Sequence, residues 1–214
     1  MNSRDAILGR IRAALRAPAP HAPAPALAAE LFPPLRADEA LPRFAREFAA
    51  LKGVFHRSPD ANDARAWVAG LAARRGFARV AAAPDDLCRD AVSGVPGAQT
   101  LEREACGAQL ASFDLGVTAC DCLVARTGSI VLTAQSGFGR ALSVLPPAHL
   151  VVARRAQLVG EIREALQLLE LRHGKMWPSM ATFITGPSRT ADIEKILVLG
   201  AHGPRELHLL FVNA

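Results

Sequence analysis

Short apolar runs alternate with helical patterns along this 214-residue chain, and this alternation constrains its fold more than any other feature. Helical spacing is present at 41–51, 62–75 and 85–92, and strand-like runs are present at 54–56, 78–82 and 99–101. A strand followed by a helix and a further strand favours a parallel sheet, because the helix returns the chain to the same edge. We therefore expect an α/β fold with a mostly parallel wound sheet flanked by helices.

The pattern changes in the middle of the chain. Two short apolar runs, 121–125 and 129–133, flank a turn that contains Gly128, and this arrangement is typical of a β-hairpin. We expect the hairpin as an insertion in the wound sheet. Beyond it we expect a strand at 149–153, a helix at 156–171 and the last strands at 183–184 and 207–212.

The first 39 residues differ from the rest. Residues 3–16 predict a short amphipathic helix, with Ser3 as its cap and Ile7, Ile11 and Leu15 on one face. The Ala/Pro-rich segment 17–39 favours an extended, semi-rigid linker. The expected organisation is an N-terminal helix at 1–16, a linker at 17–39 and a domain at 40–214. The helix is too short to persist alone, so it packs on the domain or on a second copy, or docks a partner.

Composition argues against several classes of protein. Half of the residues are hydrophobic, which is enough for a packed core. The net charge of +5 comes from scattered Arg, without a dense basic run beside aromatic residues, so nucleic-acid binding is not favoured. No apolar stretch of about 18 residues and no signal-peptide pattern is present. These features predict a cytoplasmic protein that does not cross a membrane, with a homo-oligomer as an open alternative.

The four cysteines follow no disulfide, zinc or iron–sulfur spacing. They are Cys88, Cys106, Cys120 and Cys122. We expect reduced, buried thiols and no iron–sulfur cluster on this chain, with a redox or metal role for Cys120 and Cys122 as the alternative. No spacing of His and Glu indicates a metal site, and the sequence alone assigns no cofactor.

Turn residues and charges are densest between residues 181 and 204. An apolar run there enters a Gly-Pro corner, followed by polar residues, two acids and a second corner around His202. Such a turn before a helix start is where α/β proteins bind ligands. Thr190 and Asp192 would equally serve to cap a helical turn. The candidate ligand-binding residues are Gly186, Pro187, Ser188, Arg189 and Thr190, and the candidate acids and bases are Asp192, Glu194 and His202.

Two upstream loops are candidates to complete the pocket. Thr127, Gly128 and Ser129 offer two hydroxyls and a flexible glycine, and Gly137, Gly139 and Arg140 form a glycine loop that ends in a cation. Each loop would equally serve as a structural turn. His149 opens an apolar strand, and we expect it to be a core histidine whose hydrogen bonds are satisfied.

The run from Thr185 to His208 resembles the C-terminal signature of LUD-domain proteins, specifically of the lactate utilisation protein C (LutC/YkgG) family. The stretches 116–132, 137–140 and 142–149 resemble the family's central block, so the resemblance covers about residues 40–214. It implies a fold similar to the NagB/RpiA/CoA-transferase group. It also implies a role in bacterial oxidation of L-lactate to pyruvate with iron–sulfur partner proteins. The expected ligand is a small organic acid or a nucleotide-type cofactor.

The chain departs from the family at one position. Members commonly carry Glu before the Thr-Gly of the hairpin turn, whereas this chain has Arg126. Glu would be a natural nucleophile or base, but Arg stays protonated, so covalent CoA transfer is not expected there and anion binding becomes easier. Two alternatives stay open. They are a stand-alone enzyme for a phosphorylated or CoA-linked substrate, and a non-catalytic structural or regulatory subunit.

Overall fold

The computed structural model describes residues 3–16, 33, 35–102, 107–190, 198–200 and 202–213. The chain divides into two compact units, Met1–Pro34 and Leu35–Ala214. In the first unit, helix α1 spans Ser3–Arg16, as the spacing predicted, and none of its side chains is buried.

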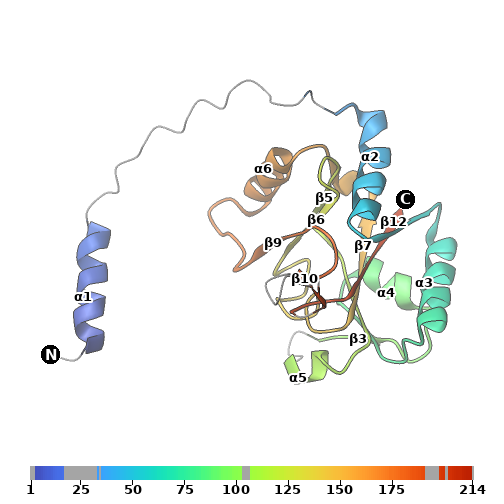
Figure 1. The fold of residues 1–214 in the computed structure, drawn as a ribbon, viewed down its shortest axis with the longest axis horizontal. Helices are drawn as coiled ribbons and strands as arrows, with labels where there is room; N and C mark the ends of the chain where they lie inside the picture. Colours follow the sequence, from blue (N-terminus) through green and yellow to red (C-terminus); the bar gives the residue numbers. More distant parts are fainter. Residues whose placement is uncertain are drawn as a thin grey trace. The chain divides into compact units, whose positions relative to one another are not determined.

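A six-stranded sheet forms the centre of the second unit, and every pairing in it is parallel (Figure 1). Its strands, in spatial order, are β1 (Val54–Ser58), β12 (Glu206–Val212), β7 (Ala148–Arg154), β4 (Leu115–Thr118), β2 (Val80–Ala82) and β3 (Gln99–Thr100). The predicted α/β class with a mostly parallel sheet is confirmed. The last strand of the chain lies between the first strand and β7, near the middle of the sheet.

Helices cover both faces of the sheet (Figure 1). They are α2 (Ala37–Ala50), α3 (Ala61–Arg75), α4 (Asp86–Val92), α5 (Gly107–Leu110) and α6 (Ile162–His173). Side chains of α3 and α4 pack with Leu150 and Val152 of β7, whereas Phe44 and Phe48 of α2 pack with Val151 on the opposite face. Consecutive residues of β7 alternate between these two cores because side chains alternate along a strand. Helix α2 begins at Ala37, before the predicted start at residue 41.

A smaller four-stranded sheet packs on the α2 side. Its order is β8 (Leu158–Val159), β5 (Cys122–Val124), β6 (Ser129–Thr133) and β9 (Ala181–Ile184). Strands β5 and β6 pair antiparallel, which confirms the predicted hairpin. The prediction of a helix from residue 156 is wrong, because Leu158 and Val159 pair with β5 and the helix begins only at Ile162. Gly160 separates the two elements.

One buried carboxylate fixes the hairpin. Asp121 is only 3 % exposed, and it accepts hydrogen bonds from the Thr133 amide at 2.8 Å, the Ser136 hydroxyl at 2.6 Å and Arg172 Nη1 at 2.6 Å. These bonds join the start of β5, the end of β6 and helix α6. A buried charge requires such partners, because its desolvation is costly.

Replacing Asp121 with Ala should lower the free energy of unfolding by about 3 kcal/mol, because three donors lose their acceptor and Arg172 loses its partner. Urea denaturation measures this loss. Asp86→Ala is the matched control, since the Asp86 side chain is 90 % exposed in its ion pair with Arg89 and should matter little. Equal effects of the two substitutions would contradict a structural role for the buried carboxylate.

The hairpin turn docks closely on helix α2. Gly128 has a φ of +64°, and a Cβ at this position would lie 2.5 Å from the Phe48 amide nitrogen. Gly139 also has a positive φ, of +85°, but a Cβ there would meet nothing within 4 Å. The two glycines therefore separate backbone strain from steric contact.

Gly139→Ala should cost about 1 kcal/mol of stability from the left-handed backbone alone. Gly128→Ala should cost more, about 2 to 4 kcal/mol, because the turn must also move away from α2. Thermal and chemical unfolding of both variants would compare them. A Gly128 variant as stable as the Gly139 variant would show that the turn does not need its close approach.

Candidate functional site

A cavity of about 170 Å³ lies at the amino ends of β7 and β12, on the side of the smaller sheet. It is lined mainly by apolar atoms. Its residues are Ser143, Val144, His149, Met180, Thr182, Ile184, Gly186, Pro187, Ser188, His202, Gly203, Pro204 and Leu207. Segments from the middle and from the end of the chain therefore form one cavity.

The two corners of the tail motif are tied together beside this cavity. The Ser188 amide donates to the Pro204 carbonyl at 2.9 Å, and the Gly200 amide donates to the Ser188 carbonyl at 2.9 Å. Strand β10 (Arg189–Thr190) then pairs antiparallel with β11 (Val198–Leu199). The prediction that Thr190 caps a helical turn is wrong, because Thr190 lies opposite Val198 in this pair.

The candidate residues of the tail motif fall into three groups. Gly186, Pro187, Ser188 and His202 line the cavity, and His202 is exposed. Arg189 is exposed on β10, and its Nη2 lies 3.3 Å from the position that a Cβ on Gly186 would occupy, so the guanidinium lies close to the corner. Asp192 and Glu194 lie outside the described residues.

The hairpin turn reaches the tail motif through hydroxyl groups. Thr127 Oγ1 and Ser129 Oγ are 2.8 Å apart, and Ser129 Oγ is 2.8 Å from Thr185 Oγ1. Thr185 directly precedes Gly186. The turn thus supports the corner, but Thr127, Gly128 and Ser129 are not among the described residues that line the cavity.

The glycine loop at 137–140 lies apart from this cavity. The Gly137 amide donates to the Thr133 carbonyl at 2.9 Å and the Gly139 amide donates to the Ala134 carbonyl at 2.7 Å, so both amides are used within the loop. Arg140 Nη2 donates to the Ser179 carbonyl at 3.4 Å. The loop amides therefore do not form a cradle for an anion.

Arg126, which stands where the family commonly has Glu, is ion-paired. Its Nε lies 2.5 Å from Oε1 of Glu161, and the Arg126 side chain is only 18 % exposed. This pair links the hairpin turn to the start of α6. Because a carboxylate already occupies the guanidinium, the pair weakens the case for anion binding by Arg126.

His149 is the polar residue of the cavity wall that the sequence placed in the core. It is 1 % exposed, and its Nε2 lies 2.9 Å from Thr118 Oγ1, while its Nδ1 has no hydrogen-bond partner among the described residues. The prediction of a fully satisfied histidine is therefore wrong for one ring nitrogen. Burial, and secondarily the nearby His208, lower the pKa of His149 to about 3, so its ring is neutral at pH 7.

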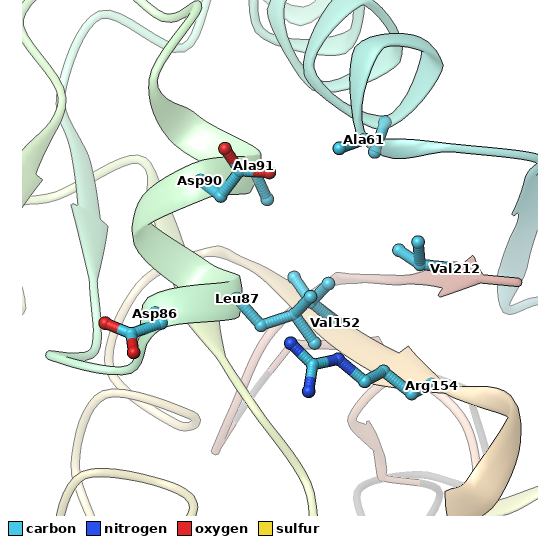
Figure 2. Close-up of a pocket in the computed structure, with 9 residues that line it drawn as sticks. Ala61, Asp86, Leu87, Asp90, Ala91, Val152, Arg154 and Val212 are labelled. Atoms are coloured by element: carbon cyan, nitrogen blue, oxygen red, sulfur yellow. The ribbon is translucent and has the colours of Figure 1, made fainter. Parts of the chain in front are cut away.

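A second, larger cavity of about 370 Å³ opens at the carboxyl ends of β7 and β12 (Figure 2). The first turns of α3 and α4 form its walls, and Arg154 projects from the end of β7 across its floor. The lining residues are Ala61, Ala64, Asp86, Leu87, Asp90, Ala91, Val152, Arg154 and Val212. Open α/β sheets bind ligands at such strand ends.

The polar groups around this second cavity are largely engaged. Asp60 accepts hydrogen bonds from the Asn62 and Asp63 amides at the start of α3, and Asp85 accepts from the Leu87 amide at the start of α4. Both helix starts are thus capped by a carboxylate, which disfavours a bare phosphate. By contrast, the first cavity has an unpaired buried nitrogen in its wall.

The thiols and possible metal ligands were also located. Cys88, Cys120 and Cys122 are free and buried, and Cys106 lies outside the described residues. Burial, and secondarily Asp121, raise the pKa of Cys122 to about 12, so its thiol stays protonated at pH 7. Within the described ranges, no group of three or more His, Cys, Asp or Glu residues could hold a metal ion. No helix there is long and apolar enough to span a bilayer.

Comparison with known proteins identifies relatives. The sequence model of the LUD domain family matches residues 41–212. Lactate utilization protein C of Halalkalibacterium halodurans is 39 % identical over 93 residues, which cover 42 % of this chain and 40 % of that protein. Lactate utilization protein C of Macrococcus caseolyticus is 32 % identical over 133 residues, which cover 61 % of this chain and 54 % of that protein. The chain thus spans about half the length of the curated relatives it matches.

A solved structure has the same fold. The crystal structure of a DUF162 family protein from Deinococcus radiodurans superposes with a TM-score of 0.60, at 23 % sequence identity. The match covers 84 % of this chain and 99 % of that chain.

The depressed pKa of His149 should make stability depend on pH. Below its ordinary pKa of 6.5 the unfolded chain binds a proton that the folded chain does not bind until about pH 3, so stability is lost as pH falls through this window. The loss should be roughly 1 kcal/mol per pH unit. We expect His149→Gln to reduce the slope of unfolding free energy between pH 6.5 and 5.

Urea denaturation at several pH values measures this slope. The remaining slope in the variant should include His208, whose pKa burial also lowers. An unchanged slope in His149→Gln would contradict the assignment of a buried, neutral imidazole.

Proposed function

Because this chain belongs to the LUD domain family, and is similar to lactate utilisation protein C, we propose that it serves in bacterial lactate utilisation, the oxidation of L-lactate to pyruvate. The family match covers residues 41–212, which include nearly all of the second unit. In this proposal the protein binds the small organic acid of the pathway in the cavity between the tail corners. Iron–sulfur partner proteins, which the resemblance implies, carry the electrons.

The size of the first cavity is the observation that carries the choice of ligand. An engineered cavity of about 150 Å³ accommodates benzene, and pyruvate and lactate are of similar size. The cavity of about 170 Å³ therefore fits such an acid, whereas a nucleotide or CoA is several times larger. Its mainly apolar lining with a few polar groups is typical of small-molecule sites.

We assign the polar residues of this cavity to binding. Ser188 and His202 come from the two tied corners, and Arg189 lies beside Gly186, where its charge would attract a carboxylate. A role for Asp192 and Glu194 as acids or bases remains part of the hypothesis, since both follow directly on β10 in the sequence.

The open cavity at the strand carboxyl ends favours a second candidate function. At about 370 Å³ it could hold part of a phosphorylated or CoA-linked substrate, with Arg154 as the cation. This enzyme would act without partners. The capped helix starts make it the weaker candidate, because their amides are already used by Asp60 and Asp85.

Calorimetric titration should separate the two functions. We expect pyruvate or L-lactate to bind the wild-type protein, and Ser143→Leu to abolish binding, because Ser143 is a small, buried residue of the cavity wall. Arg154→Ala, which alters only the second cavity, should bind the acid as wild type does. Loss of binding in Arg154→Ala alone, or binding of CoA or sugar phosphates instead, would favour the second function.

A genetic test addresses the pathway. In a bacterium without another lactate dehydrogenase, deletion of the gene should abolish growth on lactate. The wild-type gene should restore growth and Ser143→Leu should not. Undiminished growth of the deletion strain would contradict the proposed role.

A further inference from the structure

His149 presents an unused hydrogen-bonding group to the first cavity. The residue is 1 % exposed, it lines the cavity, and its Nδ1 has no partner among the described residues. An unsatisfied buried nitrogen is destabilising, and such groups are rare unless a ligand or water completes them. The vacant hydrogen bond therefore points to a group that enters the cavity.

The neighbouring threonine determines which ring nitrogen carries the proton. Thr118 is fully buried, and its hydroxyl makes one side-chain hydrogen bond among the described residues, to His149 Nε2 at 2.9 Å. If Nε2 were the donor, the hydroxyl hydrogen of Thr118 would have no acceptor. The Thr118 hydroxyl therefore donates to Nε2, and the proton of the neutral ring lies on Nδ1.

The backbone keeps this geometry in place. Gly116 lies directly opposite His149 in the β4–β7 pairing, where it has no side chain that could fill the space beside the ring. A Cβ on Gly116 would lie 2.5 Å from the Leu142 carbonyl oxygen, so a larger residue would also displace the segment before β7. The ring can therefore extend along the sheet toward Thr118.

A second donor lies in the same wall. Ser143 is 6 % exposed, and its hydroxyl makes no hydrogen bond to any of the described residues. Donors without acceptors favour a ligand that is rich in oxygen acceptors. A carboxylate or a carbonyl meets this requirement, whereas an ammonium group does not.

We infer that Nδ1–H of His149 is a hydrogen-bond donor to a carboxylate or carbonyl oxygen of a compact 2-oxo or 2-hydroxy acid, and that Thr118 positions this donor by accepting no other role than fixing the ring tautomer. The inference rests on the proposed function, because it names the group that recognises the acid in the same cavity. It assigns a binding residue and its supporting residue, and it involves no chemical step.

Two substitutions distinguish the ring nitrogens. Gln at position 149 can place an amide near the position of Nε2 and leaves Nδ1 without a replacement, whereas Asn can place its amide nitrogen near Nδ1. We expect His149→Gln to weaken pyruvate binding about 10- to 100-fold, the range for a hydrogen bond to a charged group. His149→Asn should stay within about 5-fold of wild type, since it can keep the donor.

Nitrogen-15 NMR of the histidine ring gives a readout that a purely structural role would not change. The free wild-type protein should show the Nδ1–H tautomer, and pyruvate should shift the Nδ1 resonance. Thr118→Val should give a mixture of tautomers, and Thr118→Ser should restore the single form.

The outcomes separate this inference from the proposed function. Acid binding with equal affinity in wild type and His149→Gln, or an Nε2–H tautomer in the free protein, would overturn the inference and leave the proposed function standing. No binding of any 2-oxo or 2-hydroxy acid by the wild-type protein would overturn both.

Discussion

The insertion of β12 between β1 and β7 is the constraint on which the rest of the structure depends. β12 pairs with β7 along its whole length and with β1 from His208 onward, so the end of the chain fills the middle of the sheet. The segment just before β12 must then lie at the amino end of β7. This pairing brings the 202–204 corner next to His149, and it joins the last part of the sequence to the middle part in one cavity.

The general architecture could be predicted because it follows from local patterns. Apolar periodicity indicated the strands and helices of the parallel sheet, and a glycine between two apolar runs indicated the hairpin of β5 and β6. Leu158 and Val159 look like the start of a helix, but they extend the smaller sheet beside β5. Thr190 likewise pairs with Val198. Both errors concern two-residue strands whose pairing partner lies elsewhere in the chain, which local propensity does not reveal.

The candidate site was predictable in its loops and not in its interior. Gly186, Pro187, Ser188 and His202 were recognisable by turn chemistry, and all four line the cavity. His149 was not recognised as a site residue, because its vacant nitrogen depends on Thr118, which lies 31 residues earlier. Sequence patterns indicate burial, but they do not indicate which hydrogen bonds a buried side chain lacks.

The most direct test of the account is a crystal structure of the protein grown with a high concentration of pyruvate. The account predicts electron density for the acid in the cavity between the 186–188 and 202–204 corners, with one of its oxygens within hydrogen-bonding distance of His149 Nδ1. An empty cavity there, with the acid bound beside Arg154 at the strand carboxyl ends or bound nowhere, would contradict it.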